Sequence, residues 1–228
     1  MIKRELVGLD SSALCPITPG HFLTQATSIA FQLMAQAAQS DGINIAIASS
    51  YRSYERQSLI WNRKFRGESV VLNSAGEPIP DWLFLSEQER IFAILRWSAL
   101  PGASRHHWGT DLDVYAPDLL PAGQKLQLTP AEYDEEHGYF GALTKWLNNH
   151  MNTFGFFRPY ATDQGGVAPE PWHLSYHSEA VRLQQQLTLE MLQEVIAENP
   201  LEGQHWILQL LPQIREQFII NINGENSL

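Results

Sequence analysis

The stretch SRHHWGTDLD, residues 104–113, carries the strongest information about the fold and the site of this chain. It places histidines and aspartates on both sides of Gly109, which allows the backbone to turn. His106 and Asp113 can therefore face one point. Catalytic zinc sites keep three protein ligands, commonly two histidines and one carboxylate, and leave the fourth position for water. This stretch thus predicts two ligands of a zinc site.

A second motif, EPWH at residues 170–173, supplies the other groups that such a site needs. His173 is the expected third ligand, and Glu170 could then reach a metal-bound water as general base. Pro171 argues against the interior of a helix, so the pair is expected at a strand end or bend. Because residues three apart face opposite sides of a flat strand, a bulge or twist is predicted here.

Two neighbouring residues compete for the ligand roles. His107 and Asp111 each lie within two residues of a predicted ligand, and spacing alone does not separate them. His107 could instead stack at the rim, donate a hydrogen bond to a transition-state oxygen, or support the ligands from behind.

A third motif follows a predicted strand over residues 43–48, where apolar residues alternate. That strand delivers Arg52 to its end, and a helix from Tyr54 to Phe65 follows. Arginine forms paired hydrogen bonds with carboxylates and stabilises developing oxyanions. The alternative is an internal ion pair with an acid such as Glu55 or Glu89, but the metal motifs favour a functional role.

The remaining patterns predict several helices, one long loop and one hairpin. Helical spacing, capping boxes and turn residues place these elements. They are a helix over 23–40, a loop over 67–85, a helix from the Ser86 and Glu89 capping box to Trp97, a second capping signal at Thr129, Pro130 and Glu132, a helix over 140–152, a hairpin over 154–176, and helices over 181–196 and 206–219.

Composition excludes several classes of protein. The chain has 228 residues, 44% hydrophobic and 18% charged, which is fewer charges than the roughly 25% of an average soluble protein and excludes a disordered or fibrous chain. Its net charge of −10 argues against a nucleic-acid partner. Cys15 is the single cysteine, so no intramolecular disulfide can form. No stretch approaches the roughly 20 apolar residues of a membrane span, and the first residues lack the apolar middle of a secretory signal. We therefore expect a soluble, cytoplasmic protein.

Together the three motifs resemble the zinc D-Ala-D-Ala carboxypeptidases, a VanY-like family in the superfamily that also includes lysostaphin-type peptidases and hedgehog domains. The resemblance rests on YRS with Gln57 at residues 51–57, on SxHxxGxxxD at 104–113, and on EPWH at 170–173. It covers about residues 24 to 177. One departure is Asp111, where many relatives have a small apolar residue.

The resemblance implies an α+β fold, with helices packed on a mainly antiparallel sheet. It implies zinc ligation by His106, Asp113 and His173, a general base at Glu170, and substrate binding by Arg52, Gln57 and Ser104. Residues 1–177 would form the peptidase domain, and residues 178–228 a helical extension packed on it. The apolar helices of this extension could also form a homodimer surface.

The expected function is a zinc carboxypeptidase that removes the terminal D-alanine from peptidoglycan stem peptides or muropeptides, at a D,D or an L,D bond. An endopeptidase that cleaves within the stem or a cross-bridge is the nearest enzymatic alternative. A non-catalytic, zinc-containing muropeptide-binding module is the alternative from another class, and retention of both Glu170 and Arg52 counts against it.

Overall fold

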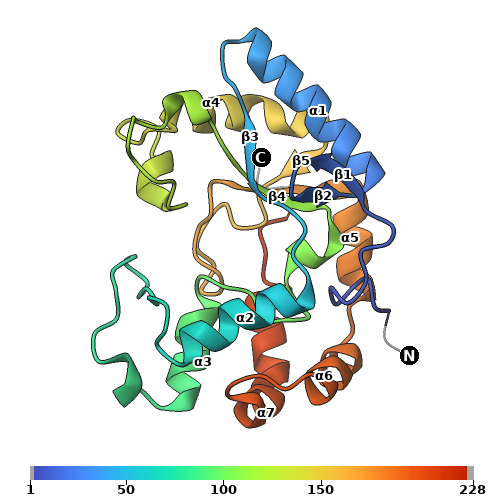
Figure 1. Ribbon diagram of the computed structural model, residues 1–228, viewed down its shortest axis with the longest axis vertical. Coiled ribbons are helices and arrows are strands. Elements are labelled where there is room, and N and C mark those ends of the chain that lie inside the picture. The colour runs from blue at the N-terminus through green and yellow to red at the C-terminus, as the bar shows by residue number, and fades with distance from the viewer. Residues whose placement is uncertain (1–2, 225–228) are drawn as a thin grey trace.

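An antiparallel sheet of four strands forms the centre of the upper half of the molecule (Figure 1). This computed structural model describes residues 3–224. The strands lie in the order β3, β4, β6 and β5, with bounds Ala46–Ser49, Asp111–Tyr115, His173–Tyr176 and Phe156–Phe157. Segments that are far apart in the sequence are thus hydrogen-bonded neighbours.

The two faces of this sheet differ in chemistry. Leu112 and Val114 of β4 and Leu174 of β6 point into an apolar core. Because side chains alternate along a strand, Asp113 and His173 point to the opposite face. Both polar side chains are buried there, so the sheet separates a polar site from the core beneath it.

Helices α1 (Gln25–Ser40) and α4 (Gly141–His150) share the apolar core with the sheet (Figure 1). Phe31 and Met34 come from α1, and Leu143 and Leu147 from α4. A short hairpin of β1 (Cys15–Thr18) and β2 (His21–Leu23) precedes α1. The side chain of Thr24 accepts a hydrogen bond from the Thr27 amide and so caps the helix.

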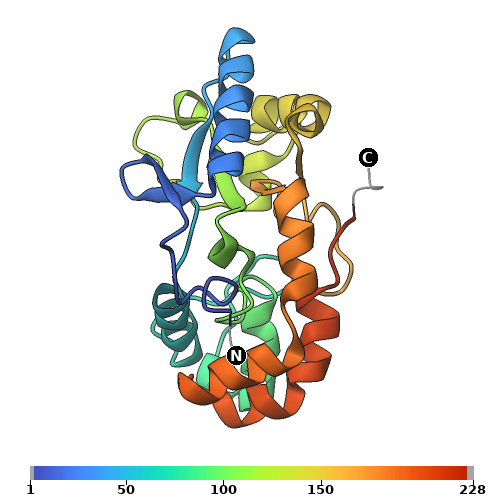
Figure 2. The ribbon, with the colours of Figure 1, turned by 90° about the vertical axis from the view of Figure 1, so that its right-hand side faces the viewer.

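The lower half is helical and has a second core. It contains α2 (Tyr54–Phe65), α3 (Glu87–Leu95), α6 (Leu189–Glu198) and α7 (Gln204–Ile214). Helix α5 (His177–Gln186) continues directly from β6 and runs between the two halves (Figure 2). Short 3-10 helices span Trp82–Phe84, Arg105–Trp108, Pro117–Leu119, Pro130–Tyr133 and Met151–Phe154, and a π-helical turn spans Arg215–Ile219.

The α+β class and most of the predicted elements are confirmed. Helix α2 has the predicted bounds, and the Ser86 and Glu89 capping box starts α3. The predicted hairpin is present, since β5 pairs with β6 antiparallel.

Two local predictions are wrong. The helix predicted over 181–196 is two helices, because the chain is extended at Leu187 and Thr188, and the Thr188 side chain caps α6. The bulge or twist expected between Glu170 and His173 is a turn closed by a 3.1 Å hydrogen bond from the His173 amide to the Glu170 carbonyl. Proline at position 171 suits such a turn.

The C-terminal helices pack on the rest of the chain. Leu192, Val195, Ile207 and Leu211 are fully buried in the lower core, which also contains Trp61 of α2. Packing within the chain therefore accounts for the apolar pattern that suggested a homodimer, and nothing in the structure supports that dimer. A division at residue 177 stays a prediction. None of the described helices is both long and apolar enough to cross a membrane.

Candidate metal centre and substrate cleft

Three predicted ligands converge on one point. One donor atom each from His106, Asp113 and His173 lies within 4.8 Å of the others. Asp113 and His173 are direct partners across β4 and β6, so the strand register fixes their separation. His106 comes from the 3-10 helix Arg105–Trp108, which Gly109 ends in a left-handed conformation with φ of 69°.

The ring of His106 is oriented by the strand end before α2. Its Nδ1 lies 2.9 Å from the carbonyl oxygen of Ser50 and donates to it, which leaves Nε2 3.5 Å from Oδ2 of Asp113. Burial lowers the pKa of His106 to about 3, so the imidazole is neutral near pH 7. A neutral ring has the lone pair that metal ligation requires.

His173 is oriented in the opposite sense. Its Nε2 donates to Oδ1 of Asp111 at 3.0 Å. Its Nδ1 then faces the other carboxylates, 3.4 Å from Oδ1 of Asp113 and 3.3 Å from Oε2 of Glu170. Metal-bound histidines commonly donate their second ring N–H to a carboxylate or carbonyl in this way.

The donor set fits a metal ion. Oδ1 of Asp113 is buried and has no hydrogen-bond partner among the described residues. A buried carboxylate oxygen without a partner is costly, and a cation between the three ligands would satisfy it. Two imidazole nitrogens and one carboxylate suit zinc, which leaves a further position for water.

The structure separates Asp111 from the ligand role. Its Oδ1 accepts from Nε of Arg105 at 2.7 Å as well as from His173, and its Oδ2 accepts from the Thr110 hydroxyl at 2.6 Å. Both oxygens are therefore occupied behind the site. Arg105 also donates to Ser175 on β6 at 2.7 Å, so it connects Asp111 to the neighbouring strand. The sequence analysis did not identify Arg105.

His107 also lies outside the metal cluster. Its Nδ1 donates to the Arg52 carbonyl at 2.6 Å, and its Nε2 accepts from the Gly102 amide at 3.0 Å. Burial lowers the pKa of His107 to about 4, so the ring stays neutral. Gly8 packs against it so closely that a Cβ there would lie 2.3 Å from Nδ1. His107 thus joins three chain segments.

Glu170 lies at the edge of the metal cluster. The turn over residues 170–173 brings its carboxylate next to His173, and the side chain keeps an exposed fraction of 14%. Burial raises the pKa of Glu170 above its ordinary value, although His173 opposes the shift. A carboxyl with a raised pKa can exchange a proton closer to neutral pH.

Arg52 faces the same cavity with neutral partners. Its Nη1 donates to Oε1 of Gln57 at 2.8 Å, and its Nη2 donates to the Ser49 hydroxyl at 3.1 Å. Neither predicted internal acid, Glu55 or Glu89, pairs with it in the described structure. The guanidinium is thus held in place with its charge uncompensated by a direct ion pair.

Gln57 lies behind Arg52. It is fully buried, and its Nε2 donates to the Ala99 carbonyl at 2.7 Å while its Oε1 accepts from Arg52. The amide therefore fixes the guanidinium against the segment after α3, and it does not line the cavity.

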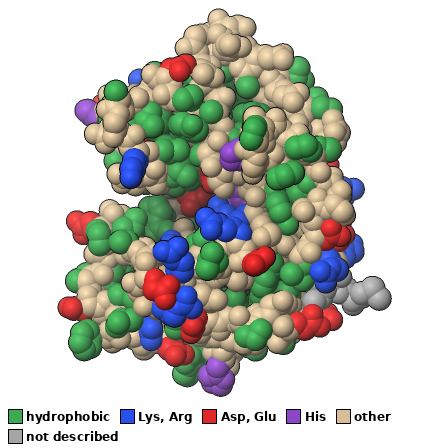
Figure 3. Space-filling view, in the orientation of Figure 1, with side chains coloured by type: hydrophobic (Ala, Val, Ile, Leu, Met, Phe, Trp, Pro, Cys, Tyr) green, Lys and Arg blue, Asp and Glu red, His purple; other side chains and the backbone are tan. Residues whose placement is uncertain are grey.

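A cavity of about 300 Å³ opens beside the metal cluster. Figure 3 shows the molecule hollowed between its halves, with acidic side chains at the back and Lys and Arg side chains along the lower edge. Ser104 lines this cavity, and its hydroxyl is buried without a partner among the described residues. The lining also includes Arg52, Lys64, Tyr160, Glu170 and Trp172.

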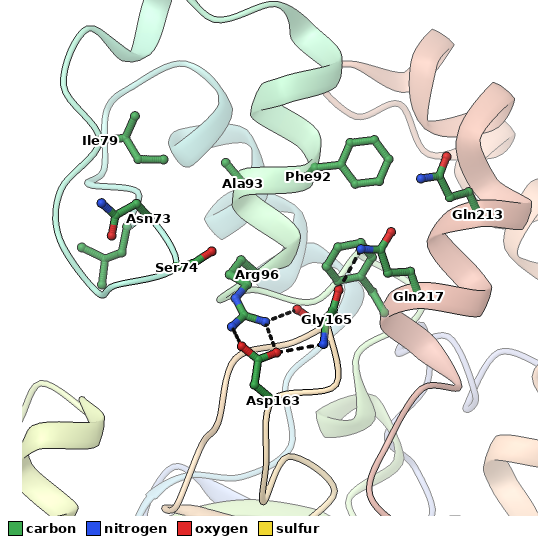
Figure 4. Close-up of a pocket in the computed structure, with 13 residues that line it drawn as sticks. Asn73, Ser74, Ile79, Phe92, Ala93, Arg96, Asp163, Gly165, Gln213 and Gln217 are labelled. Carbon is green, nitrogen blue, oxygen red and sulfur yellow. Dashed lines mark hydrogen bonds and ion pairs between the residues drawn. The ribbon is translucent and has the colours of Figure 1, made fainter.

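A larger, more open groove of about 600 Å³ lies elsewhere (Figure 4). The bidentate ion pair of Arg96 with Asp163 lies in its wall, beside Gly165 and Gln217. None of the predicted catalytic or ligand residues lines it. The smaller cavity is the candidate active site, because it is lined by the three predicted metal ligands and by Glu170.

Comparison with known proteins shows the family of this chain. The family model described as VanY, D-alanyl-D-alanine carboxypeptidase, matches residues 20–179. The chain belongs to this family. Membership indicates carboxypeptidase activity on peptidoglycan peptides.

Two curated relatives show how far the similarity extends. An uncharacterized protein of Haemophilus influenzae is 40% identical over 123 residues, covering 53% of this chain and 93% of the relative. A D-alanyl-D-alanine carboxypeptidase of Enterococcus faecalis is 28% identical over 148 residues, covering 64% of this chain and 44% of the relative. The chain therefore spans less than half of that carboxypeptidase.

Solved structures support the fold. A vancomycin-resistance D,D-pentapeptidase VanY variant in complex with Zn(II) has a TM-score of 0.53 at 26% identity, over 78% of this chain and 86% of that chain. VanYB in complex with D-alanine-D-alanine has a TM-score of 0.54 at 24% identity, over 79% of this chain and 87% of that chain.

Proposed function

We propose that the protein is a zinc-dependent carboxypeptidase that hydrolyses the terminal D-alanine peptide bond of peptidoglycan stem peptides. One observation carries this proposal. Arg52, which has only neutral hydrogen-bond partners, faces the same cavity as the three-ligand cluster and Glu170. An exopeptidase needs a cation for the terminal carboxylate next to the site of bond cleavage, and this arrangement supplies it.

The protein residues would divide the work as follows. His106, Asp113 and His173 would hold zinc, which supplies an activated water and polarises the scissile carbonyl. Arg52 would bind the terminal carboxylate, and the Ser104 hydroxyl would donate to the same end of the peptide. Glu170 would accept the proton of the attacking water and return it to the leaving amine. Gln57 would act as a positioning residue for Arg52.

The position of Glu170 supports its role as the base. Its carboxylate lies 3.3 Å from Nδ1 of His173, so it would adjoin a metal held by the three ligands without being one of them. The resemblance to a D,D-pentapeptidase favours the D,D bond as the first to test.

The test compares purified wild type with Glu170→Gln, and with Glu136→Gln, whose carboxylate is exposed, as matched control. Zinc content and D-alanine release are measured with acylated stem pentapeptide and tetrapeptide. We expect about one zinc per chain in all three proteins and a loss of at least about a thousandfold in turnover only for Glu170→Gln. Full turnover in that variant would contradict the proposal. Release of internal fragments without D-alanine would favour an endopeptidase.

A further inference from the structure

The face of α2 that lines the cavity carries a second cation. Ile60 and Lys64 both line the cavity, and Gln57 precedes them at helical spacing on the same face. Gln57 holds Arg52 at the beginning of this face. Lys64 lies seven residues after Gln57, which is two turns further along the helix.

Among the described residues, Lys64 has a neutral hydrogen-bond partner and no ion pair. Its Nζ donates to the Ser98 hydroxyl at 2.6 Å. Within residues 3–224, no carboxylate oxygen lies within the 4.0 Å of an ion pair with Nζ. A partly buried ammonium with only a neutral partner loses solvation without gaining a counter-charge. An anion that binds in the cavity would supply the missing counter-charge.

The acidic groups of the cavity are engaged elsewhere and form no direct ion pair with Lys64 in the described structure. Arg105 is paired with Asp111, and Asp113 belongs to the metal cluster together with Glu170 at its edge. Arg52 and Lys64 remain as two cations with neutral hydrogen-bond partners. Basic side chains along the edge of the hollow are visible in Figure 3.

We propose that Lys64 is a specificity-determining residue that binds a second carboxylate of the substrate, located upstream of the terminal D-alanine. The inference rests on the proposed function, because it assigns the terminal carboxylate to Arg52. The preferred substrate is thus a peptide with two anionic groups, and its amidated counterpart binds more weakly.

Helix geometry gives the spacing of the two carboxylates. Two turns of helix correspond to about 10 Å along the axis. An extended peptide covers about 3.3 Å per residue, so the second carboxylate belongs two to three residues before the terminal one. In a peptide that ends in D-Ala-D-Ala, this is the residue before the dipeptide or its neighbour.

The electrostatics of Lys64 agree with this assignment. Burial lowers the pKa of Lys64 to about 8, and Arg52 adds to this shift while Glu170 opposes it. The ammonium is therefore still charged near pH 7. A bound carboxylate would restore the counter-charge that the protein lacks there.

The test uses acetyl-Glu-D-Ala-D-Ala and acetyl-Gln-D-Ala-D-Ala, which have nearly the same shape and differ in one charge. Affinity is measured by calorimetry in zinc-loaded Glu170→Gln protein, so that substrate is not consumed. Three further proteins add Lys64→Met, Lys64→Arg or Lys145→Met to the Glu170→Gln protein. Lys145 is exposed on α4, so Lys145→Met is the control. D-alanine release is measured separately in proteins with Glu170 intact.

We expect the Glu peptide to bind about tenfold more tightly than the Gln peptide, as hydrogen bonds to charged groups typically provide. Lys64→Met should reduce this ratio to about one, while Lys64→Arg and Lys145→Met should retain it. Equal affinities in the background protein, or an unchanged ratio in Lys64→Met, would overturn the inference. A binding ratio that depends on Lys64, without D-alanine release by wild type, would support Lys64 as an anion contact and reject only the carboxypeptidase.

Discussion

Asp111 accepts a hydrogen bond from Nε2 of His173 at 3.0 Å and turns the other ring nitrogen of His173 toward Asp113. The same oxygen of Asp111 accepts from Arg105. Asp111 therefore supports a metal-ligand candidate, His173, from behind the site.

Replacing Asp111 should weaken metal binding. In Asp111→Asn the amide oxygen can accept from the same two donors but carries no charge, and the amide nitrogen cannot accept from the Thr110 hydroxyl. His173 is therefore less well oriented, and Arg105 loses its ion pair. We expect zinc affinity to fall by about tenfold, measured by competition with a chromophoric chelator. The exposed Asp118→Asn is the control. Equal zinc affinity in the two variants would show that Asp111 does not orient the ligand.

Substitution of the two adjacent histidines should have different effects. His106→Ala removes a donor of the metal cluster, so zinc content should fall well below one per chain. His107→Ala should retain zinc but leave the Arg52 carbonyl and the Gly102 amide without partners. The expected loss is about 3 kcal/mol of unfolding free energy, measured by denaturant titration. Loss of zinc in His107→Ala with the fold intact would reverse the assignment.

Gln57→Leu should impair substrate binding through Arg52. The substitution removes the acceptor of Nη1 and leaves the Ala99 carbonyl without its donor. We expect kcat/KM for a peptide with a free terminal carboxylate to fall about tenfold, mainly through KM. The exposed Gln36→Leu on α1 serves as control. A loss confined to kcat, with KM unchanged, would argue against the positioning role.

Selectivity for the doubly anionic peptide should depend on pH. Since the pKa of Lys64 is lowered to about 8, its charge is present below this pH and is lost above it. The ratio of kcat/KM for the Glu and Gln peptides should therefore be constant near pH 6 to 7 and fall as pH rises through about 8. Both substrates use the same zinc, Glu170 and Arg52, so their shared titrations cancel in the ratio. A ratio that stays constant to pH 9.5 would contradict the role of Lys64, and Lys64→Arg should show that constancy.

Local sequence signals placed much of the fold. The helix expected after the strand end is α2, and the capping box at Ser86 predicted the start of α3, because such signals lie within a few residues of the element that they start. The division of the predicted helix at Thr188 was missed, since apolar spacing continues across the break while the chain turns to fill the lower core. Capping at Thr188 is the local signal that could have revealed it.

The sequence by itself determined which residues could form the site. Histidine, aspartate and glutamate at residues 104–113 and 170–173 fixed the donor types, and Arg52 after a strand supplied a cation. Only the tertiary structure decided which of them meet. The register of β4 against β6 places Asp113 opposite His173, and the hydrogen bond that Nε2 of His173 donates to Asp111 selects the ring nitrogen that faces the cluster. Lys64 joins the cavity only because α2 packs beside the segment at Ser98. These relationships depend on contacts between distant parts of the chain, which local propensities and spacing do not specify.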